Sequence, residues 1–181
     1  GAIGTDIGIT KFDQAGGNLI YSTYLGGSDS EAPHSLVVNS NNELYIFGTT
    51  ASNDFPTLSN AYQQTFAGGT PVAPTSSGMN YTNGTDILVA RLNATGTGLI
   101  ASTLLGGSGN DGVNEGDSLA FNYGDPFRGE IILDQNEHPI VATTTSSINF
   151  PMAGGSPQGI YGGGDTDGCA FRFNPNLSTL E

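Results

Sequence analysis

A ten-residue segment occurs twice in this chain, and its repetition constrains the fold more than any other sequence feature. Residues 19–28 read LIYSTYLGGS and residues 99–108 read LIASTLLGGS, so eight of the ten positions are identical. The neighbouring motif repeats as well, because GTD at 4–6 recurs at 84–86. A chain of this kind uses one structural unit several times, as solenoids and propellers do.

The runs between the turn signals predict β-strands. Residues 6–12 alternate apolar and polar side chains, and residues 43–50 are rich in strand formers. Residues 36–38 (LVV) are apolar on both faces, which predicts a strand buried between two layers. The run NSNN at 39–42 predicts a turn, because Asn tolerates positive φ. Only 12% of the residues are charged and 28 are glycine, so an all-β fold is favoured over helices.

The spacing of the motifs reveals two insertions. NDFP at 53–56 returns as INFP at 148–151, an offset of 95 residues, whereas the ten-residue segment has an offset of 80. Each copy carries an insertion of about 14 residues, at 71–83 and at 109–129, which leaves a unit of about 66 residues. An insertion at a loop leaves the sheet intact.

The bare unit predicts four antiparallel strands in one sheet. After a polar connection at 28–33, the expected strand order is 36–38, 43–50, 86–92 and 99–105. A repeated four-stranded sheet is typical of a β-propeller blade, because one sheet cannot bury its own faces and stacked blades bury each other.

The domain prediction is therefore a single propeller segment over 1–181. Residues 1–28 form the outer half of one blade, 36–105 a complete blade and 130–181 a partial blade. A closed ring needs about four to eight blades. Since this chain supplies about two and a half, we expect a segment of a larger propeller, or one partner in an assembly that completes the ring. The alternative is an open β-sandwich.

Charge restricts the partners. The net charge is −13, with only 4 Lys and Arg, so binding to nucleic acid or to anionic membranes is disfavoured. No stretch approaches the ~18 apolar residues of a membrane span, so no membrane insertion is expected. Residues 1–10 lack the features of a signal peptide, as a mature or excised segment also would. The acidic, Ser/Thr/Asn-rich composition favours an extracellular or outer-surface location.

Five motifs, in this order along the chain, resemble a known family. They are IYSTYLGGS at 20–28, GTTASNDFP at 48–56, YQ at 62–63, GG at 68–69 and DILVARLN at 86–93. Together they resemble the SBBP family of seven-bladed β-propeller repeats, which occur in large secreted and surface proteins of bacteria, including the Bacteroidota. The second copy departs from the pattern at 142–145 (ATTT) and at Leu104. The resemblance implies an extracellular scaffold and no particular reaction.

One acidic loop is a candidate calcium site. Residues 108–117 read SGNDGVNEGD, and the candidate ligands there are Asp111, Asn114, Glu115 and Asp117. Calcium takes six to eight hard oxygen ligands, which such a loop offers from side chains and carbonyls. The spacing is not that of an EF-hand, and a solvated acidic turn is the alternative. DTDG at 165–168 is a weaker candidate, because its second Asp aligns with Asp6 and Asp86 and favours a role at the start of a strand.

Catalytic residues are not apparent. His34 and His138 are interpreted as exposed loop residues, since no serine elbow or Cys–His spacing accompanies them. The acid pairs Asp29/Glu31 and Asp111/Glu115 are of the type used in glycoside chemistry, but the chain has no Trp for sugar stacking.

Four further side chains are assigned to packing. Cys169 is the only cysteine, so no internal disulfide forms, and it is interpreted as a buried, inert thiol. Tyr21, Tyr24 and Tyr45 are expected to pack between blades.

These observations predict a non-enzymatic structural or adhesive module. Its insertions at 71–83 and 109–129 are expected to bind protein or glycan at the cell surface, with further blades of the same protein as the other partner. One alternative is a propeller-type polysaccharide lyase or glycoside hydrolase. Another is a cargo module of a bacterial secretion system.

Overall fold

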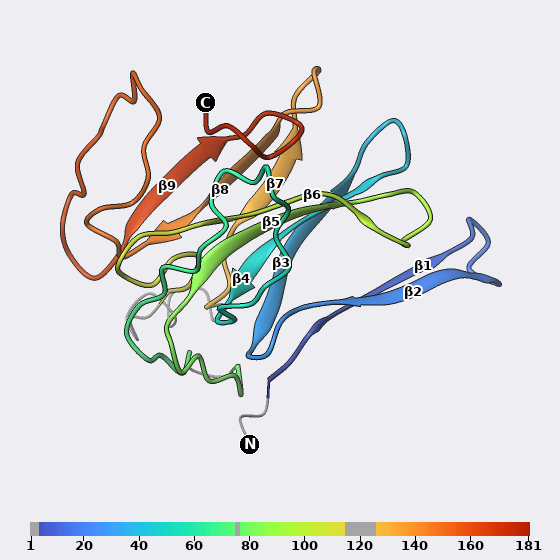
Figure 1. Ribbon diagram of the computed structural model, residues 1–181, viewed down its shortest axis with the longest axis horizontal. Helices are drawn as coiled ribbons and strands as arrows, with labels where there is room; N and C mark the ends of the chain where they lie inside the picture. Colours follow the sequence, from blue (N-terminus) through green and yellow to red (C-terminus); the bar gives the residue numbers. More distant parts are fainter. Residues whose placement is uncertain (1–3, 75–76, 115–125) are drawn as a thin grey trace.

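The computed structural model describes residues 4–74, 77–114 and 126–181, and these form antiparallel β-strands without helices (Figure 1). The predicted all-β class is therefore confirmed. No helix in the described ranges has the length and apolar character needed to cross a membrane. The strands are β1 (Ile7–Phe12), β2 (Leu19–Leu25), β3 (Glu31–Val38), β4 (Leu44–Thr50), β5 (Asp86–Leu92), β6 (Leu99–Leu105), β7 (Glu130–Leu133), β8 (Pro139–Thr145) and β9 (Asp167–Arg172).

The strands form three sheets. The first is β1–β2, the central sheet has the order β3–β4–β5–β6, and the third has the order β7–β8–β9. In Figure 1 the β1–β2 hairpin stands at one side of the central sheet, and β7–β9 lie at the other. The strand order of the central sheet is the one predicted from the repeat. All neighbouring strands are antiparallel and consecutive in sequence.

The start of β3 differs from the prediction. Residues 28–33 were expected to be a connection, but Glu31 and Ala32 already pair with Thr50 and Thr49 of β4. The register shifts between Pro33 and Ser35, so the proline lies at an irregularity of the ladder. Proline has no N–H for a ladder and is tolerated on an edge strand or at a bulge, and β3 continues past it to Val38.

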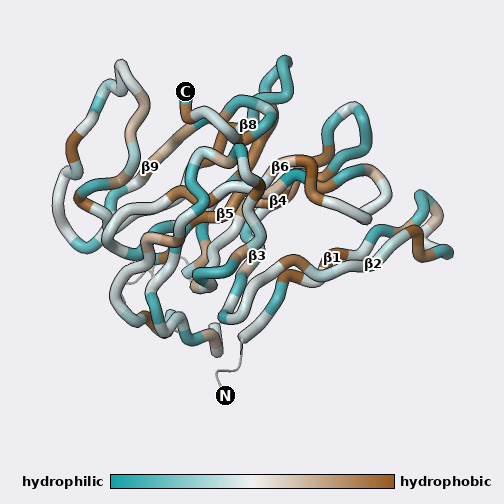
Figure 2. Tube along the Cα trace, in the orientation of Figure 1, coloured by the Kyte–Doolittle hydropathy of each residue, from teal (hydrophilic) through white to brown (hydrophobic). Residues whose placement is uncertain are grey.

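Two hydrophobic cores lie on opposite faces of the central sheet, and the apolar runs that build them are visible in Figure 2. The core toward the third sheet joins Tyr45, Phe47, Ile87, Val89, Ala101 and Leu105 to Ile131, Val141, Phe171, Phe173 and Leu177. The core toward the first sheet joins Leu44, Ile46, Leu88, Ala90, Leu92 and Leu104 to Ile7, Ile9 and Leu25. The central sheet is thus buried on both faces along β4, β5 and most of β6.

The edge strand β3 of the central sheet and the strand β2 of the first sheet leave apolar side chains uncovered. Leu36 and Val38 of β3 are 62% and 51% exposed, so the prediction that residues 36–38 are buried on both faces is wrong. The reason is that the first sheet has no described strand opposite these two side chains. Tyr24 is 79% exposed and does not pack between sheets. Tyr21 and Tyr45 do, as predicted.

The same side-chain hydrogen bond closes each repeated hairpin. The Oδ1 atom of Asp13 accepts from the backbone N of Gly17 at 2.9 Å, and Asn93 accepts from Thr97 in the same way at 2.9 Å. Asn174 accepts from the backbone N of Ser178, again at 2.9 Å. The segment after β9 therefore begins the same hairpin as the segments after β1 and β5.

A second turn is also repeated. Asn39 Oδ1 accepts from the backbone N of Glu43 at 2.9 Å, and Asp134 Oδ1 accepts from the backbone N of His138 at 2.9 Å. The predicted turn at 39–42 is confirmed, with Asn42 at φ 62°. Such side-chain bonds to the following backbone are what favour Asn and Asp in turns.

Candidate functional site

The first glycine of the repeated Gly-Gly lies against two carboxylates in both copies. A Cβ atom on Gly106 would lie 2.5 Å from Asp86 Oδ1 and 2.9 Å from Asp111 Oδ2. A Cβ atom on Gly26 would lie 2.5 Å from both Asp6 Oδ1 and Glu31 Oε2. A side chain at either glycine would push these carboxylates out of place, which accounts for the first glycine of each repeated Gly-Gly.

Asp86 is a buried acceptor at the start of β5. Its carboxylate accepts from the backbone N of Ala67 at 2.8 Å and of Gly68 at 2.9 Å, and from Gln63 Nε2 at 3.2 Å. Burial raises the pKa of Asp86 to about 7, and the nearby Asp111 acts in the same direction. The carboxyl therefore fastens residues 63–68 to the strand.

Asp111 is the second carboxylate at Gly106, and it links the central sheet to the third sheet; we call such a link a carboxylate corner. Asp111 is fully buried, and its Oδ2 accepts from the backbone N of Gly107 at 2.8 Å and from Ser147 Oγ at 2.9 Å. Thr145 Oγ1 donates to its Oδ1. Gly107 follows β6 of the central sheet and Thr145 ends β8 of the third, so this carboxylate ties successive sheets together.

Glu31 makes the corresponding tie between the first and central sheets. It accepts from the backbone N of Gly27 at 3.1 Å and from Thr50 Oγ1 at 2.6 Å. Burial raises the pKa of Glu31. The recurring carboxylates are therefore buried structural acceptors in both copies.

The structure describes two of the four candidate calcium ligands. Asp111 is engaged as above, and Asn114 is buried with its backbone N donating to Pro126 O at 2.9 Å. Glu115 and Asp117 lie outside the described residues. Within the ranges that are described, no three His, Cys, Asp or Glu side chains are grouped to hold a metal ion. Calcium binding stays a prediction that depends on Glu115 and Asp117.

The two histidines differ from each other. His34 is on β3 rather than in a loop, with its ring 4.9 Å from Phe47 and 5.4 Å from Phe127 between centroids. The prediction of an exposed loop residue is wrong for His34, because β3 starts before it. Burial lowers the pKa of His34 to about 3, so the ring is neutral at pH 7. His138 follows its turn, as predicted, but it is half-buried and not exposed, and its Nδ1 lies 2.8 Å from Glu181 Oε2.

The remaining candidates are structural in their contacts. Cys169 is half-buried on β9, and burial raises the pKa of its thiol to about 12, which agrees with an inert thiol. Asp29 accepts from Thr82 Oγ1 at 2.8 Å and from Asn83 Nδ2 at 3.4 Å. Asp167 opens β9 as Asp86 opens β5, and it accepts from the backbone N of Gly162.

The two insertions are anchored more firmly than the sequence suggested. Tyr81 is fully buried, and its backbone pairs with Val72 across residues 71–83. Residues 110–114 are also buried, so the prediction of an exposed loop at 109–129 is wrong at its beginning. They belong to the carboxylate corner. Pro71, Ala73 and Asn80 are exposed.

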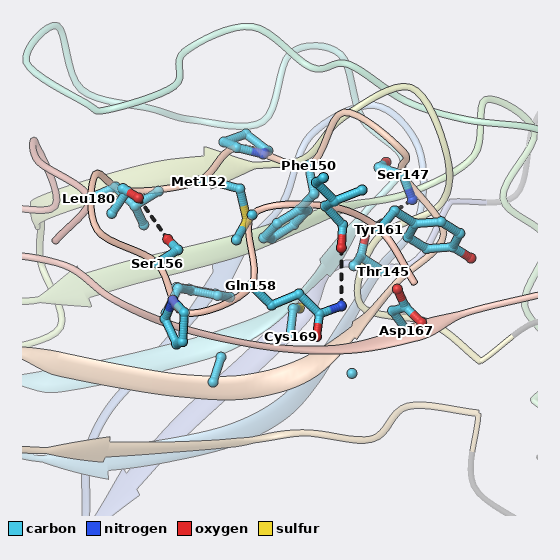
Figure 3. A pocket seen from close by; sticks show the side chains of 18 of the residues that line it. Thr145, Ser147, Phe150, Met152, Ser156, Gln158, Tyr161, Asp167, Cys169 and Leu180 are labelled. Carbon is cyan, nitrogen blue, oxygen red and sulfur yellow. Dashed lines mark hydrogen bonds between the residues drawn. The ribbon is translucent and has the colours of Figure 1, made fainter. Parts of the chain in front are cut away.

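Two grooves open where the outer sheets are uncovered. The first, the β9 groove, has a volume of about 320 Å³ and lies between β9 and the loop of residues 151–166 (Figure 3). Its lining includes Phe150, Gln158, Tyr161, Asp167, Cys169 and Phe171. The second, the β1–β3 groove, has a volume of about 650 Å³ and is lined by residues including Ile9, Phe12, Tyr21, Leu36, Val38 and Leu44. Sequence reasoning missed both grooves, although comparing the copies strand by strand points to them.

Comparison with known proteins adds no identity. No family model matches the chain, and no curated protein is significantly similar to it. Function is therefore inferred from the geometry of the chain itself.

Proposed function

We propose that this chain is a non-enzymatic scaffold, a β-propeller segment of the SBBP type from a secreted or cell-surface bacterial protein. Its loops present contact surfaces for protein or glycan. The observation that carries the proposal is the pair of buried carboxylate corners, Glu31 and Asp111, which repeat the same tie between one sheet and the next.

The approach of the first strands of successive sheets supports propeller stacking. Ser35 Oγ of β3 donates to Glu130 of β7. At the following turns, Asn39 Nδ2 donates to Glu137 Oε2 at 3.0 Å, and Ser40 Oγ donates to Glu137 Oε1 at 2.7 Å. Contacts between equivalent inner strands are expected where blades converge on an axis.

The state of the polar groups supports a scaffold over an enzyme. The buried carboxylates of Asp86 and Asp111 are closed off from solvent and accept hydrogen bonds from the protein. His34 is packed among aromatic rings and neutral at pH 7, and the raised pKa of Cys169 keeps its thiol protonated. General acid–base and nucleophilic chemistry need groups that reach a substrate.

Binding to an array of bacterial surface polysaccharides, combined with an assay for new reducing ends, tests the proposal. We expect the labelled chain to bind without releasing sugar, and the double variant Ala73→Asp/Asn80→Ala in the exposed insertion to bind at least tenfold more weakly. Gln14→Ala, in the exposed turn after β1, is the matched control and should bind like the parent chain. Release of reducing ends by the parent chain would overturn the scaffold and favour the lyase or hydrolase alternative.

A further inference from the structure

The β9 groove occupies the place that β6 fills in the central sheet. Asp167 and Asp86 open equivalent strands, β9 and β5, and each accepts a hydrogen bond from the loop that precedes its strand. In the central sheet, β6 pairs with β5, from Ile87↔Leu105 to Leu92↔Leu99. In the described part of the third sheet no such strand lies beside β9, and the groove is there instead.

The edge of β6 that faces away from β5 shows which hydrogen bonds a strand in the groove could make. The loop that precedes β5 bonds to this edge: Leu104 N donates to Gln63 O at 3.0 Å, and Leu58 N donates to Ser102 O at 3.3 Å. Gln63 also receives a bond at its Oε1 from the backbone N of Gly106, at 3.2 Å. β6 is therefore one strand held on both edges, by β5 on one side and by the loop on the other.

The loop of the third sheet has the same internal construction. Gln158 Nε2 donates to Ile160 O at 3.0 Å, just as Gln63 Nε2 donates to Thr65 O at 3.0 Å. The loop extends beside β9 in Figure 1, and Gln158, Tyr161 and Asp167 border the groove in Figure 3. The loop is thus preformed to hold a strand.

The first residues of such a strand are already in position. Phe173 and Leu180 form an antiparallel bridge, and the backbone N of Glu181 donates to Arg172 O at 2.8 Å. Leu180 and Glu181 border the β9 groove. The groove continues the edge on which this pairing begins.

We propose that the β9 groove is a binding site for one extended strand with the outer-strand sequence of this repeat, Ser-Thr-x-Leu-Gly-Gly. The strand lies antiparallel to β9, in line with residues 179–181, and its Gly-Gly faces Asp167 as Gly106 faces Asp86. Both edges of the bound strand are hydrogen-bonded, by β9 and by residues 151–166. A folded second copy does not fit, because its β2 strand already uses one edge to pair with β1. The site is separate from the exposed insertion to which ligand binding was assigned above.

The test extends the chain after Glu181 with Ala-Ser-Thr-Leu-Leu-Gly-Gly-Ser, which copies residues 101–108. We expect the backbone amides of β9 to exchange with deuterium at least tenfold more slowly in the extended chain. Alkylation of Cys169, the only thiol, should slow as well, because it borders the groove. The extended chain should remain a monomer.

A matched extension with Val-Val in place of Gly-Gly tests the register, because side chains there would collide with Asp167. We expect it to lose most of the protection, and a Gly-Ser linker of equal length to give none. The free octapeptide should bind the unextended chain with a stoichiometry of one. Equal protection by all three extensions, no protection by any, or protection only in a dimer would each overturn the proposal. Glycan binding by the unextended chain reports separately on the scaffold function.

Discussion

The central sheet and the third sheet contain equivalent strands, yet they provide very different surroundings for equivalent residues. Every residue of β4 is buried, whereas β8 alternates between buried and more exposed positions. Asp86 is fully buried, while Asp167 at the same position is half-exposed. Ile131 of β7 is 2% exposed, while its counterpart Leu36 in the central sheet is 62% exposed. The repeat sequence determines the strands and turns, and the neighbouring sheets determine burial.

The largest difference in stability between the two sheets should appear when each of the two equivalent aspartates is removed in turn. Asp86→Ala leaves buried donors of Ala67, Gly68 and Gln63 without their acceptor, and we expect a loss of about 4 kcal/mol in the free energy of unfolding, or a failure to fold. Asp167→Ala should cost less than about 1 kcal/mol, because its surroundings are open to water. Urea unfolding followed by circular dichroism measures both. Equal losses would contradict the comparison.

The apolar pair Ile131 and Leu36 should show the next largest difference. Ile131→Ala removes a side chain buried between two sheets and should cost about 3 kcal/mol. Leu36→Ala should change stability by no more than about 0.5 kcal/mol, since Leu36 is mostly in water. Tyrosine fluorescence during urea unfolding is a suitable probe, because the chain has no Trp. A large loss for Leu36→Ala would show that another element covers β3.

The raised pKa of Asp86 predicts a pH dependence. The folded chain keeps this proton up to about pH 7, whereas an unperturbed Asp releases it near 3.8. The folded state therefore binds more protons between these values, so this contribution is complete below pH 3.8 and is lost as the pH rises through 7. We expect the contribution to fall by about 2 kcal/mol or more over this range, since one pKa unit corresponds to about 1.4 kcal/mol.

The comparison of the parent chain with Asp86→Asn isolates this group from the other carboxylates. The free energy of unfolding of the parent chain minus that of Asp86→Asn should be highest near pH 4 and lowest above pH 7. Gln14→Ala, which removes no ionisable group, is the control and should follow the parent chain at every pH. If this signed difference instead rose with pH, the anion of Asp86 would be the form that the fold favours.

The smallest effect is expected at the turn after β9. Leu177 has φ 54°, where the equivalent turns have Gly16 at φ 70° and Gly96 at φ 67°. It is also fully buried in the core. Leu177→Gly relieves backbone strain but loses apolar burial, so we expect the free energy of unfolding to fall by about 1 kcal/mol. Leu177→Ala loses burial without relief, so thermal denaturation should show it to be less stable than Leu177→Gly.

Much of the strand arrangement was predictable from the sequence. The predicted strands at 86–92 and 99–105 coincide with β5 and β6, and the turn residue Asn42 has the expected positive φ. These features depend on local patterns. The start of β3 was missed because Pro33 is usually a sign that a strand is absent, and here it lies at an irregularity of the ladder.

The candidate site was less predictable, because its contacts are distant in sequence. The acidic loop was identified, but two of the partners of Asp111 are Thr145 and Ser147, 34 and 36 positions away. No local pattern indicates that this carboxylate is buried. The exposure of Leu36 likewise depends on what lies opposite it, which the sequence of β3 does not contain.

The first strand has a consequence for how the isolated chain behaves in solution. Among the described strands, β1 pairs only with β2, so its other edge is open for further hydrogen bonding. An open edge beside an apolar groove promotes edge-to-edge association of molecules. The net charge of −13 opposes this association through mutual repulsion. That repulsion vanishes near the isoelectric point of about 4.1. The chain should therefore lose colloidal stability in mild acid while its fold persists, and salt, which screens the repulsion, should have a similar effect at neutral pH.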